Sequence, residues 1–193
     1  FYLNNFATKR FLHYNNLNMN NIKDFPTTNY NSFFQRVYFS SIINNIISFG
    51  ELRDTNKTIL DFGCGQKVLS KKLKGVNVLN YDIKPEYSDY ETYSNLKFDI
   101  IVFNHVLMYL YPNEIESLMD EIKLISPKCK IIVGLGKQNF LSKVGKFITG
   151  NINAHIDTRS SYNTQIEILS RKTKVNKIKK NIFFMTDIYC GEF

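Results

Sequence analysis

Hydrophobic and polar positions along the chain follow two alternating periods, which predicts helices and strands in turn. From Ser32 to Phe49 the apolar residues recur at helical spacing, and Gly50 is a typical helix end. Short apolar runs predict strands at residues 58–62, 76–81, 98–103, 130–133, 175–184 and 187–193. Amphipathic segments predict further helices that begin near Val68 and cover residues 113–125, 138–148 and 162–170.

Individual residues predict where some of these elements begin and end. Asn113 follows Pro112, so we expect it to cap the helix over 113–125, with Glu116 as its partner in a capping box. Residues 84–97 hold a proline and many polar side chains, which predicts a loop. Residues 1–31 are rich in asparagine and aromatic residues and predict a short helix or two with loops.

Strands that alternate with helices predict an α/β fold, with a doubly wound, mostly parallel sheet and helices on both of its faces. The carboxyl ends of parallel strands meet at one edge, where ligands bind in such sheets. This places residues 61–65, Asp82, Asn104 and His105 together. We expect a single domain over residues 1–193, in which residues 1–57 form a helical cap and substrate segment and residues 58–193 form the core.

Composition narrows the classes of protein to consider. A chain of 193 residues that is 44% hydrophobic suffices for one packed domain, and no apolar run approaches the about 18 residues of a membrane span. The three cysteines are widely spaced and none has a metal-ligand pattern with histidine, so we expect a reducing, cytoplasmic setting without disulfides or bound metal. The net charge of +8 is mostly lysine in a chain rich in Asn, Ile, Phe and Tyr, which indicates compositional drift but leaves a nucleic-acid partner open. The oligomeric state is not predicted.

The strongest motif is the end of the strand at 58–62, which continues as Asp61-Phe62-Gly63-Cys64-Gly65. Glycines between a strand and a helix let the backbone approach a ligand closely, and the helix start offers unpaired N–H groups. Asp82 ends the next strand, 19 residues after Gly63, close to the offset of about 20 at which a carboxylate binds ribose hydroxyls. The two motifs together predict an adenosine-containing ligand.

These segments resemble the motifs of class I, Rossmann-like S-adenosylmethionine-dependent methyltransferases. The residues around Gly63 look like the first motif, Tyr81-Asp82-Ile83 is similar to the acidic second motif, and residues 98–107 resemble the fourth strand with its turn. Residues 186–189 match the closing antiparallel hairpin, so the resemblance covers residues 58–193. Two departures stand out: Lys67 occupies the position of a third glycine, and the chain is abbreviated between the second and fourth strands, where Asp89 is a candidate for the contact to adenine.

The resemblance implies S-adenosyl-L-methionine as cofactor and a role for each matching residue. The loop of Gly63, Cys64 and Gly65 would pass along the methionine moiety, and Asp61 would help to bind its amino end. Asp82 would bind the ribose hydroxyls, and Ile83 would pack on the adenine. Asn104 and His105 would line the site beside the sulfonium.

The chemistry of methyl transfer asks the protein chiefly to hold an acceptor in line with an already activated methyl group. A base helps if the acceptor is a hydroxyl. His105 is our first candidate because it follows a strand end. His155 is the second because it lies in a late loop that often faces the substrate, so we also expect it to contact the acceptor. Tyr109 is a candidate to position the acceptor.

We therefore expect a methyltransferase that acts on a small molecule, such as a sugar, a lipid-linked or an aromatic acceptor. A nicotinamide-dependent oxidoreductase is disfavoured because Val68 stands where its fingerprint has Gly or Ala. A methyltransferase of RNA or another nucleic acid stays open, although the sequence Asn104-His105-Val106-Leu107 lacks the Pro-Pro-aromatic pattern of enzymes that act on base amino groups. A non-catalytic binding subunit also stays open, because Lys67 and the abbreviated segment depart from the family.

Overall fold

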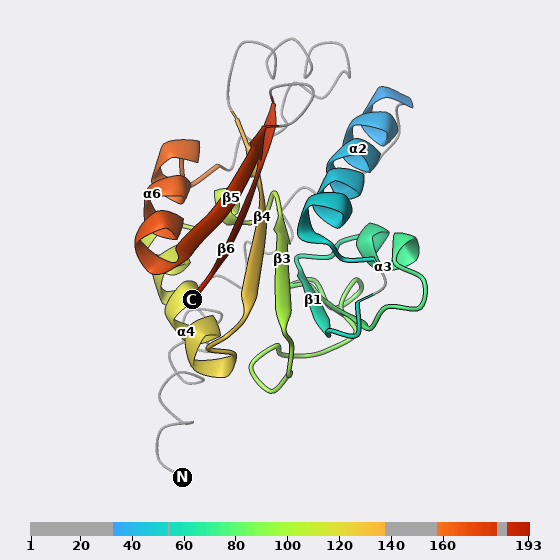
Figure 1. Cartoon of the computed structure of the whole chain (residues 1–193), viewed down its shortest axis with the longest axis horizontal. Coiled ribbons are helices and arrows are strands. Elements are labelled where there is room, and N and C mark those ends of the chain that lie inside the picture. Colours follow the sequence, from blue (N-terminus) through green and yellow to red (C-terminus); the bar gives the residue numbers. More distant parts are fainter. Residues whose placement is uncertain (1–32, 54, 138–157, 181–184) are drawn as a thin grey trace.

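One six-stranded sheet organises the chain, seen here in a computed structural model that describes residues 33–53, 55–137, 158–180 and 185–193. The strand order is β2-β1-β3-β4-β6-β5 (Figure 1). The strands are β1 (Ile59–Phe62), β2 (Val78–Tyr81), β3 (Ile100–Asn104), β4 (Lys130–Gly136), β5 (Lys174–Lys180) and β6 (Thr186–Glu192). The strands β1 to β4 run parallel, while β6 is antiparallel to both β4 and β5. The predicted mostly parallel sheet with a closing antiparallel hairpin is confirmed.

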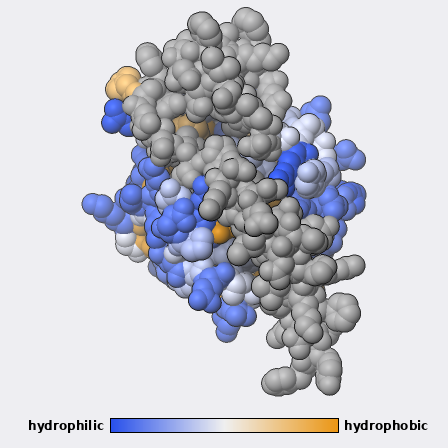
Figure 2. All heavy atoms as spheres, turned by 180° about the vertical axis from the view of Figure 1, so that it is seen from behind, coloured by the Kyte–Doolittle hydropathy of each residue, from blue (hydrophilic) through white to orange (hydrophobic). Residues whose placement is uncertain are grey.

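Helices cover both faces of this sheet (Figure 1). The described helices are α2 (Phe33–Gly50), α3 (Val68–Lys72), α4 (Pro112–Ile125), α6 (Tyr162–Lys172) and the short 3₁₀ helix η2 (Leu107–Tyr109). One apolar core lies between the sheet and α2 with α3, and the other lies between the sheet and α4 with α6. The helices expected within residues 1–31 and 138–148 lie outside the described residues. Described side chains that are visible from behind are mostly hydrophilic (Figure 2).

The beginning of α4 corrects the predicted cap. The helix starts at Pro112, with Tyr111 as its N-cap, and the backbone N–H of Tyr111 donates to the Glu114 carboxylate over 2.7 Å. The predicted pair of Asn113 and Glu116 is therefore wrong by two residues. Proline suits the first helical position because its missing N–H would have no partner there.

A buried tyrosine anchors the loop that joins β2 to β3. Turns without a helix or strand cover residues 83–97, as the sequence predicted, and β2 is consequently an edge strand. Tyr93 is 1% exposed, and its ring centroid lies 5.0 Å from that of Phe62 and 5.1 Å from that of Tyr81. Its hydroxyl donates to the Glu121 carboxylate of α4 over 2.7 Å. One side chain thus fastens the abbreviated crossing to the sheet and to a helix.

We predict that Tyr93→Phe lowers the free energy of unfolding by about 1–3 kcal/mol, because the half-buried Glu121 carboxylate loses its donor. Urea unfolding at pH 7 measures this loss. Tyr90→Phe, on the same loop but 36% exposed, is the matched control and should change stability by less than about 0.5 kcal/mol. Equal effects of the two substitutions would show that the bond to Glu121 does not anchor the loop.

Candidate functional site

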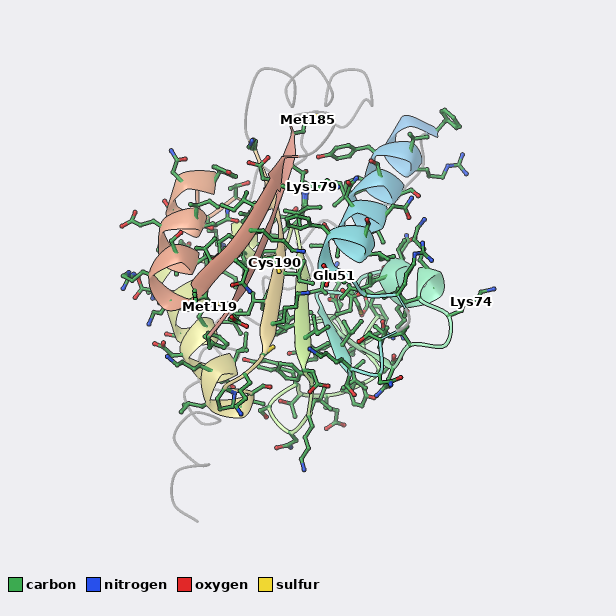
Figure 3. The ribbon with its side chains drawn as sticks, viewed as in Figure 1. Glu51, Lys74, Met119, Lys179, Met185 and Cys190 are labelled. Atoms are coloured by element: carbon green, nitrogen blue, oxygen red, sulfur yellow. The ribbon has the colours of Figure 1, made fainter. Side chains whose placement is uncertain are left out.

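The carboxyl ends of four parallel strands and the start of β6 meet at one edge of the sheet. Met185, which precedes β6, marks this edge in Figure 3. The described residues that were predicted to act together, namely Asp61, Gly63, Cys64, Gly65, Asp82, Ile83, Asn104 and His105, all lie at or just beyond these strand ends. The topology therefore brings the expected site residues to a common edge.

The turn after β1 needs glycine at two positions. Gly63 and Gly65 have φ angles of +76° and +47°, in the left-handed region that favours glycine. A Cβ atom on Gly63 would lie 2.4 Å from Cγ2 of Val106, so a side chain has no room there. A Cβ atom on Gly65 would meet nothing within 4 Å. The turn thus packs tightly on the β3 side and leaves open space beside Gly65.

The Asp82 carboxylate is fixed by backbone groups on both sides. Its Oδ2 accepts from the Gly65 N–H over 2.9 Å, and its Oδ1 accepts from the Lys84 N–H over 3.0 Å. A carboxylate has about four lone-pair positions, so two remain for donors of a ligand. Ile83, the next residue, is 44% exposed although it is apolar. The end of β2 thus combines a fixed acceptor with an apolar surface.

The second carboxylate of the site, Asp61, is buried. It is 4% exposed, and within the described ranges no hydrogen-bond donor or cation contacts its oxygens. Burial, and secondarily the negative charge of Asp82, raises the pKa of Asp61 to about 7. Such a carboxylate gains most from a ligand that brings a positive charge.

Cys64 and Lys67 have structural partners. The Cys64 thiol donates to the Tyr87 carbonyl over 3.4 Å, and burial raises its pKa, which disfavours a nucleophilic thiolate. Lys67 has a φ of +56°, which explains why glycine suits this position, and its ammonium pairs with Asp89. The other oxygen of Asp89 accepts from the Asn80 amide over 2.8 Å. The carboxylate expected to contact adenine is thus already bound by two side chains of this chain.

His105 follows β3 in a left-handed backbone conformation, with a φ of +59°. Its N–H donates to the Gly134 carbonyl over 3.0 Å, and its Nε2 lies 3.0 Å from the Thr186 hydroxyl. The Thr186 hydroxyl lies 2.6 Å from that of Tyr38 on α2. Sequence reasoning missed Thr186 and Tyr38, because an isolated threonine at a strand start and a tyrosine in a helical pattern both look like packing residues.

Three predicted site residues remain, namely Asn104, Tyr109 and His155. Asn104 ends β3, and its buried Oδ1 has no hydrogen-bond partner among the described residues. Tyr109 ends η2 and is half-buried. His155 lies outside the described residues, so its expected roles as second base and as substrate contact stay predictions.

A second polar cluster at this edge was not predicted. Asp187 is 1% exposed, and its Oδ2 lies 2.7 Å from the Lys137 ammonium and accepts from the Tyr162 hydroxyl over 2.7 Å. Both partners come from elements far away in the sequence, which is why no local motif indicates them. Within the described ranges, no group of three or more His, Cys, Asp or Glu side chains has a metal-binding arrangement. The helices of the described ranges are also too short or too polar to cross a bilayer.

Comparisons with known proteins place this geometry in a family. The sequence model of a methyltransferase domain family matches residues 34–130. No curated protein sequence matches the chain.

Solved structures share the fold at low identity. Magnesium protoporphyrin IX methyltransferase from Synechocystis PCC 6803, with bound S-adenosylhomocysteine (SAH), has a TM-score of 0.57 at 15% identity, over 97% of this chain and 95% of that chain. A protein from Pyrococcus horikoshii OT3 has a TM-score of 0.64 at 16% identity, over 88% and 96% of the two chains. The small RNA methyltransferase HEN1 has a TM-score of 0.60 at 14% identity, over 80% of this chain but 25% of that one.

The burial of Asp61 predicts a pH-dependent cost in stability. The pKa of Asp61 in the folded chain lies above its ordinary value, so this group favours folding below about pH 4 and loses that contribution as the pH rises through about 7. Asp61→Asn should therefore raise the free energy of unfolding at pH 8 by up to about 4 kcal/mol, because a tenfold change in proton affinity is worth about 1.4 kcal/mol.

Urea unfolding of the ligand-free protein at pH 4.5 and pH 8 measures this effect, which should fall to about 1 kcal/mol at the lower pH. Asp120→Asn, at an exposed carboxylate on α4, is the control and should change stability little at either pH. A loss of stability in Asp61→Asn at pH 8 would mean that the carboxylate has a compensating partner.

Proposed function

Because the chain belongs to the methyltransferase domain family, whose methyl donor is S-adenosylmethionine, we propose that it methylates a small-molecule acceptor at the carboxyl edge of its sheet. The observation that carries the proposal is the pair of carboxylates beside the glycine turn. Asp61 is a buried carboxyl group that contacts no cation within the described part of the chain, and Asp82 is a carboxylate held in place by two backbone N–H groups. A ligand with one ammonium and adjacent hydroxyls matches this pair.

The side chains at this edge of the sheet fit the chemical groups of the cofactor. In the proposal, Asp61 binds the ammonium of the methionine moiety, and Asp82 accepts hydrogen bonds from the ribose hydroxyls. The open space at Gly65 admits the part of the cofactor that joins its ammonium end to its ribose, and the exposed Ile83 packs on the adenine. Cys64 contributes backbone and packing, since its thiol is bonded to the Tyr87 carbonyl. When bound, the cofactor supplies a methyl group on a positively charged sulfur.

The acceptor side of the proposed site follows β3. Asn104 and His105 are consecutive residues at the strand end. A hydrogen bond from the backbone N–H of His105 to the Gly134 carbonyl holds their backbone against β4. We assign these two side chains to the contact with the acceptor, with Tyr109 as a further wall residue. Correct placement of the acceptor is the main contribution that such a site makes to the rate.

Three observations favour a small molecule over RNA. The chain and the porphyrin methyltransferase cover 97% and 95% of each other, whereas it covers 25% of the small RNA methyltransferase. The turn after β3 begins with Asn104 and His105 rather than with an Asn-Pro-Pro-aromatic sequence. Several basic side chains of the described part are already paired with acidic ones, among them Lys67, Lys137, Arg171, Lys172 and Lys177. RNA binding that weakens steeply with salt would favour the RNA alternative.

We predict that the chain binds SAH and that Asp82→Asn weakens this binding at least about tenfold, because a charge-assisted bond to a hydroxyl is worth about 1.5–3 kcal/mol. Isothermal titration calorimetry measures both affinities, with NAD as a ligand that should not bind and Asp120→Asn as the surface control. No heat of binding at millimolar SAH would refute the proposal and favour the non-catalytic subunit.

We further predict that SAH affinity rises with pH up to about 7 and then levels off. In the free chain Asp61 is largely protonated below pH 7, and an ammonium ligand binds only the ionised form well, so each pH unit below 7 costs up to about tenfold in affinity. Titrations between pH 5.5 and 8 measure the slope. Asp61→Asn should bind more weakly and show a flat profile; an unchanged slope in this variant would assign the titration to another group.

A further inference from the structure

A lysine in a left-handed backbone conformation stands at the beginning of α3. Lys67 caps this helix with a φ of +56° and a ψ of +40°, and its side chain makes no capping hydrogen bond. Glycine and asparagine adopt this conformation readily, whereas a residue with a long side chain does so at a cost in free energy. Because the turn itself does not require lysine, a role for this residue has to be sought in what its side chain contacts.

The Lys67 side chain links the turn after β1 to the loop after β2. Its ammonium pairs with Oδ1 of Asp89, and Oδ2 of Asp89 accepts from the Asn80 amide over 2.8 Å. The backbone N–H of Asp89 also donates to the Asn80 carbonyl over 3.0 Å. Asn80 in turn lies opposite Asp61 in the pairing of β2 with β1. A chain of polar contacts therefore runs from the start of α3 to the strand position next to Asp61.

Two further contacts hold the same stretch of the loop. The Ser88 hydroxyl accepts from the backbone N–H of Asp82 over 3.2 Å, and the Tyr87 carbonyl accepts from the Cys64 thiol over 3.4 Å. The loop thus lies against both the turn after β1 and the end of β2. Within the described residues, the pair of Lys67 and Asp89 is the ion pair among these links.

The ion pair holds the end of the loop that carries the proposed nucleoside contacts. The loop between β2 and β3 contains neither helix nor strand, and the buried Tyr93 fastens its far part. Asp82 and Ile83 lie at its near end, a few residues before Asp89. The hydrogen bond with Lys67 lowers the pKa of Asp89, so this carboxylate stays charged at neutral pH. A loop that is ordered before a ligand arrives loses less entropy when the ligand binds.

We propose that Lys67 is a positioning residue for the nucleoside: its ion pair with Asp89 holds the loop after β2 against the turn after β1, so that Asp82 and Ile83 meet the ligand in a fixed place. The inference rests on the proposed function for the identity of the ligand. It also changes the meaning of Lys67, which supports binding in this chain instead of opposing it. The lysine does for the abbreviated crossing what a packed helix and strand would otherwise do.

Calorimetry with SAH on the full chain tests this role. Lys67→Asn keeps a residue that accepts the left-handed backbone but removes the ammonium, and it should weaken SAH binding about three- to fivefold, as expected for an exposed ion pair. Lys67→Arg retains the pair and should bind like the wild type. Lys71→Gln is the matched control, because Lys71 is an exposed residue of the same helix and makes no ion pair within the described part of the chain.

Urea unfolding of the same variants separates positioning from stability. The urea midpoint of Lys67→Asn should equal or exceed that of the wild type, because asparagine adopts the left-handed conformation at a lower cost and an exposed ion pair adds little. Affinity and stability should therefore change independently. A midpoint that falls together with the affinity, or an equal loss of affinity in Lys71→Gln, would overturn the proposal.

A double-mutant cycle shows whether the two side chains act as a pair. Asp89→Asn removes the charge but keeps an oxygen for the Asn80 amide. If the ion pair is the unit that acts, the double variant of Lys67→Asn and Asp89→Asn should bind SAH as weakly as either single variant. Losses that add, or a much larger loss in Asp89→Asn alone, would show that Asp89 contacts the ligand itself and would overturn the role given to Lys67.

Amide hydrogen exchange in the ligand-free chain distinguishes this inference from the proposed function. The Asp89 N–H, which is bonded to the Asn80 carbonyl, should exchange about three- to fivefold faster in Lys67→Asn than in the wild type and at an unchanged rate in Lys71→Gln. An unchanged rate in Lys67→Asn would overturn the proposal whatever the ligand is. Faster exchange in a chain that binds no SAH would retain the ordering of the loop and overturn its role toward a nucleoside, together with the proposed function.

Discussion

The Asp82 carboxylate accepts a hydrogen bond from the Gly65 N–H and thereby ties the end of β2 to the turn that follows β1. The parallel pairing of β1 with β2 brings the two segments to the same edge, and the left-handed glycines let the turn bend toward the carboxylate. Without this bond, the position of the Asp82 carboxylate relative to the open space at Gly65 would not be fixed. The proposed binding of a nucleoside at this edge depends on it.

The site is built at a cost in stability that other contacts offset. Asp61 is buried close to a second carboxylate, which raises its pKa to about 7, and Lys67 and His105 adopt left-handed backbone conformations without being glycine. Such departures are typical of functional edges in folds that are otherwise locally consistent. The crossing between β2 and β3 offsets part of this cost, since Tyr93 and the ion pair of Lys67 with Asp89 fasten it to the sheet without the usual helix.

Periodicity and short motifs were enough to predict the sheet, the closing hairpin and the edge at which the site residues gather. Those features follow from local signals, such as the apolar run of β3 and the glycines after β1. The start of α4 was misplaced because proline at the first helical position and a tyrosine N-cap give a weaker signal than the asparagine next to them. The hydroxyls of Thr186 and Tyr38 and the ion pair of Lys137 with Asp187 are contacts between distant segments, so only the tertiary structure brings them together.

A crystal structure of the chain in complex with SAH tests the assignment of the two carboxylates most directly. We predict that the ligand's ribose hydroxyls lie within hydrogen-bond distance of the Asp82 carboxylate, with its ammonium on Asp61 and its adenine against Ile83. A ligand bound elsewhere, or one whose ammonium leaves Asp61 without a partner, would contradict the assignment of the two carboxylates.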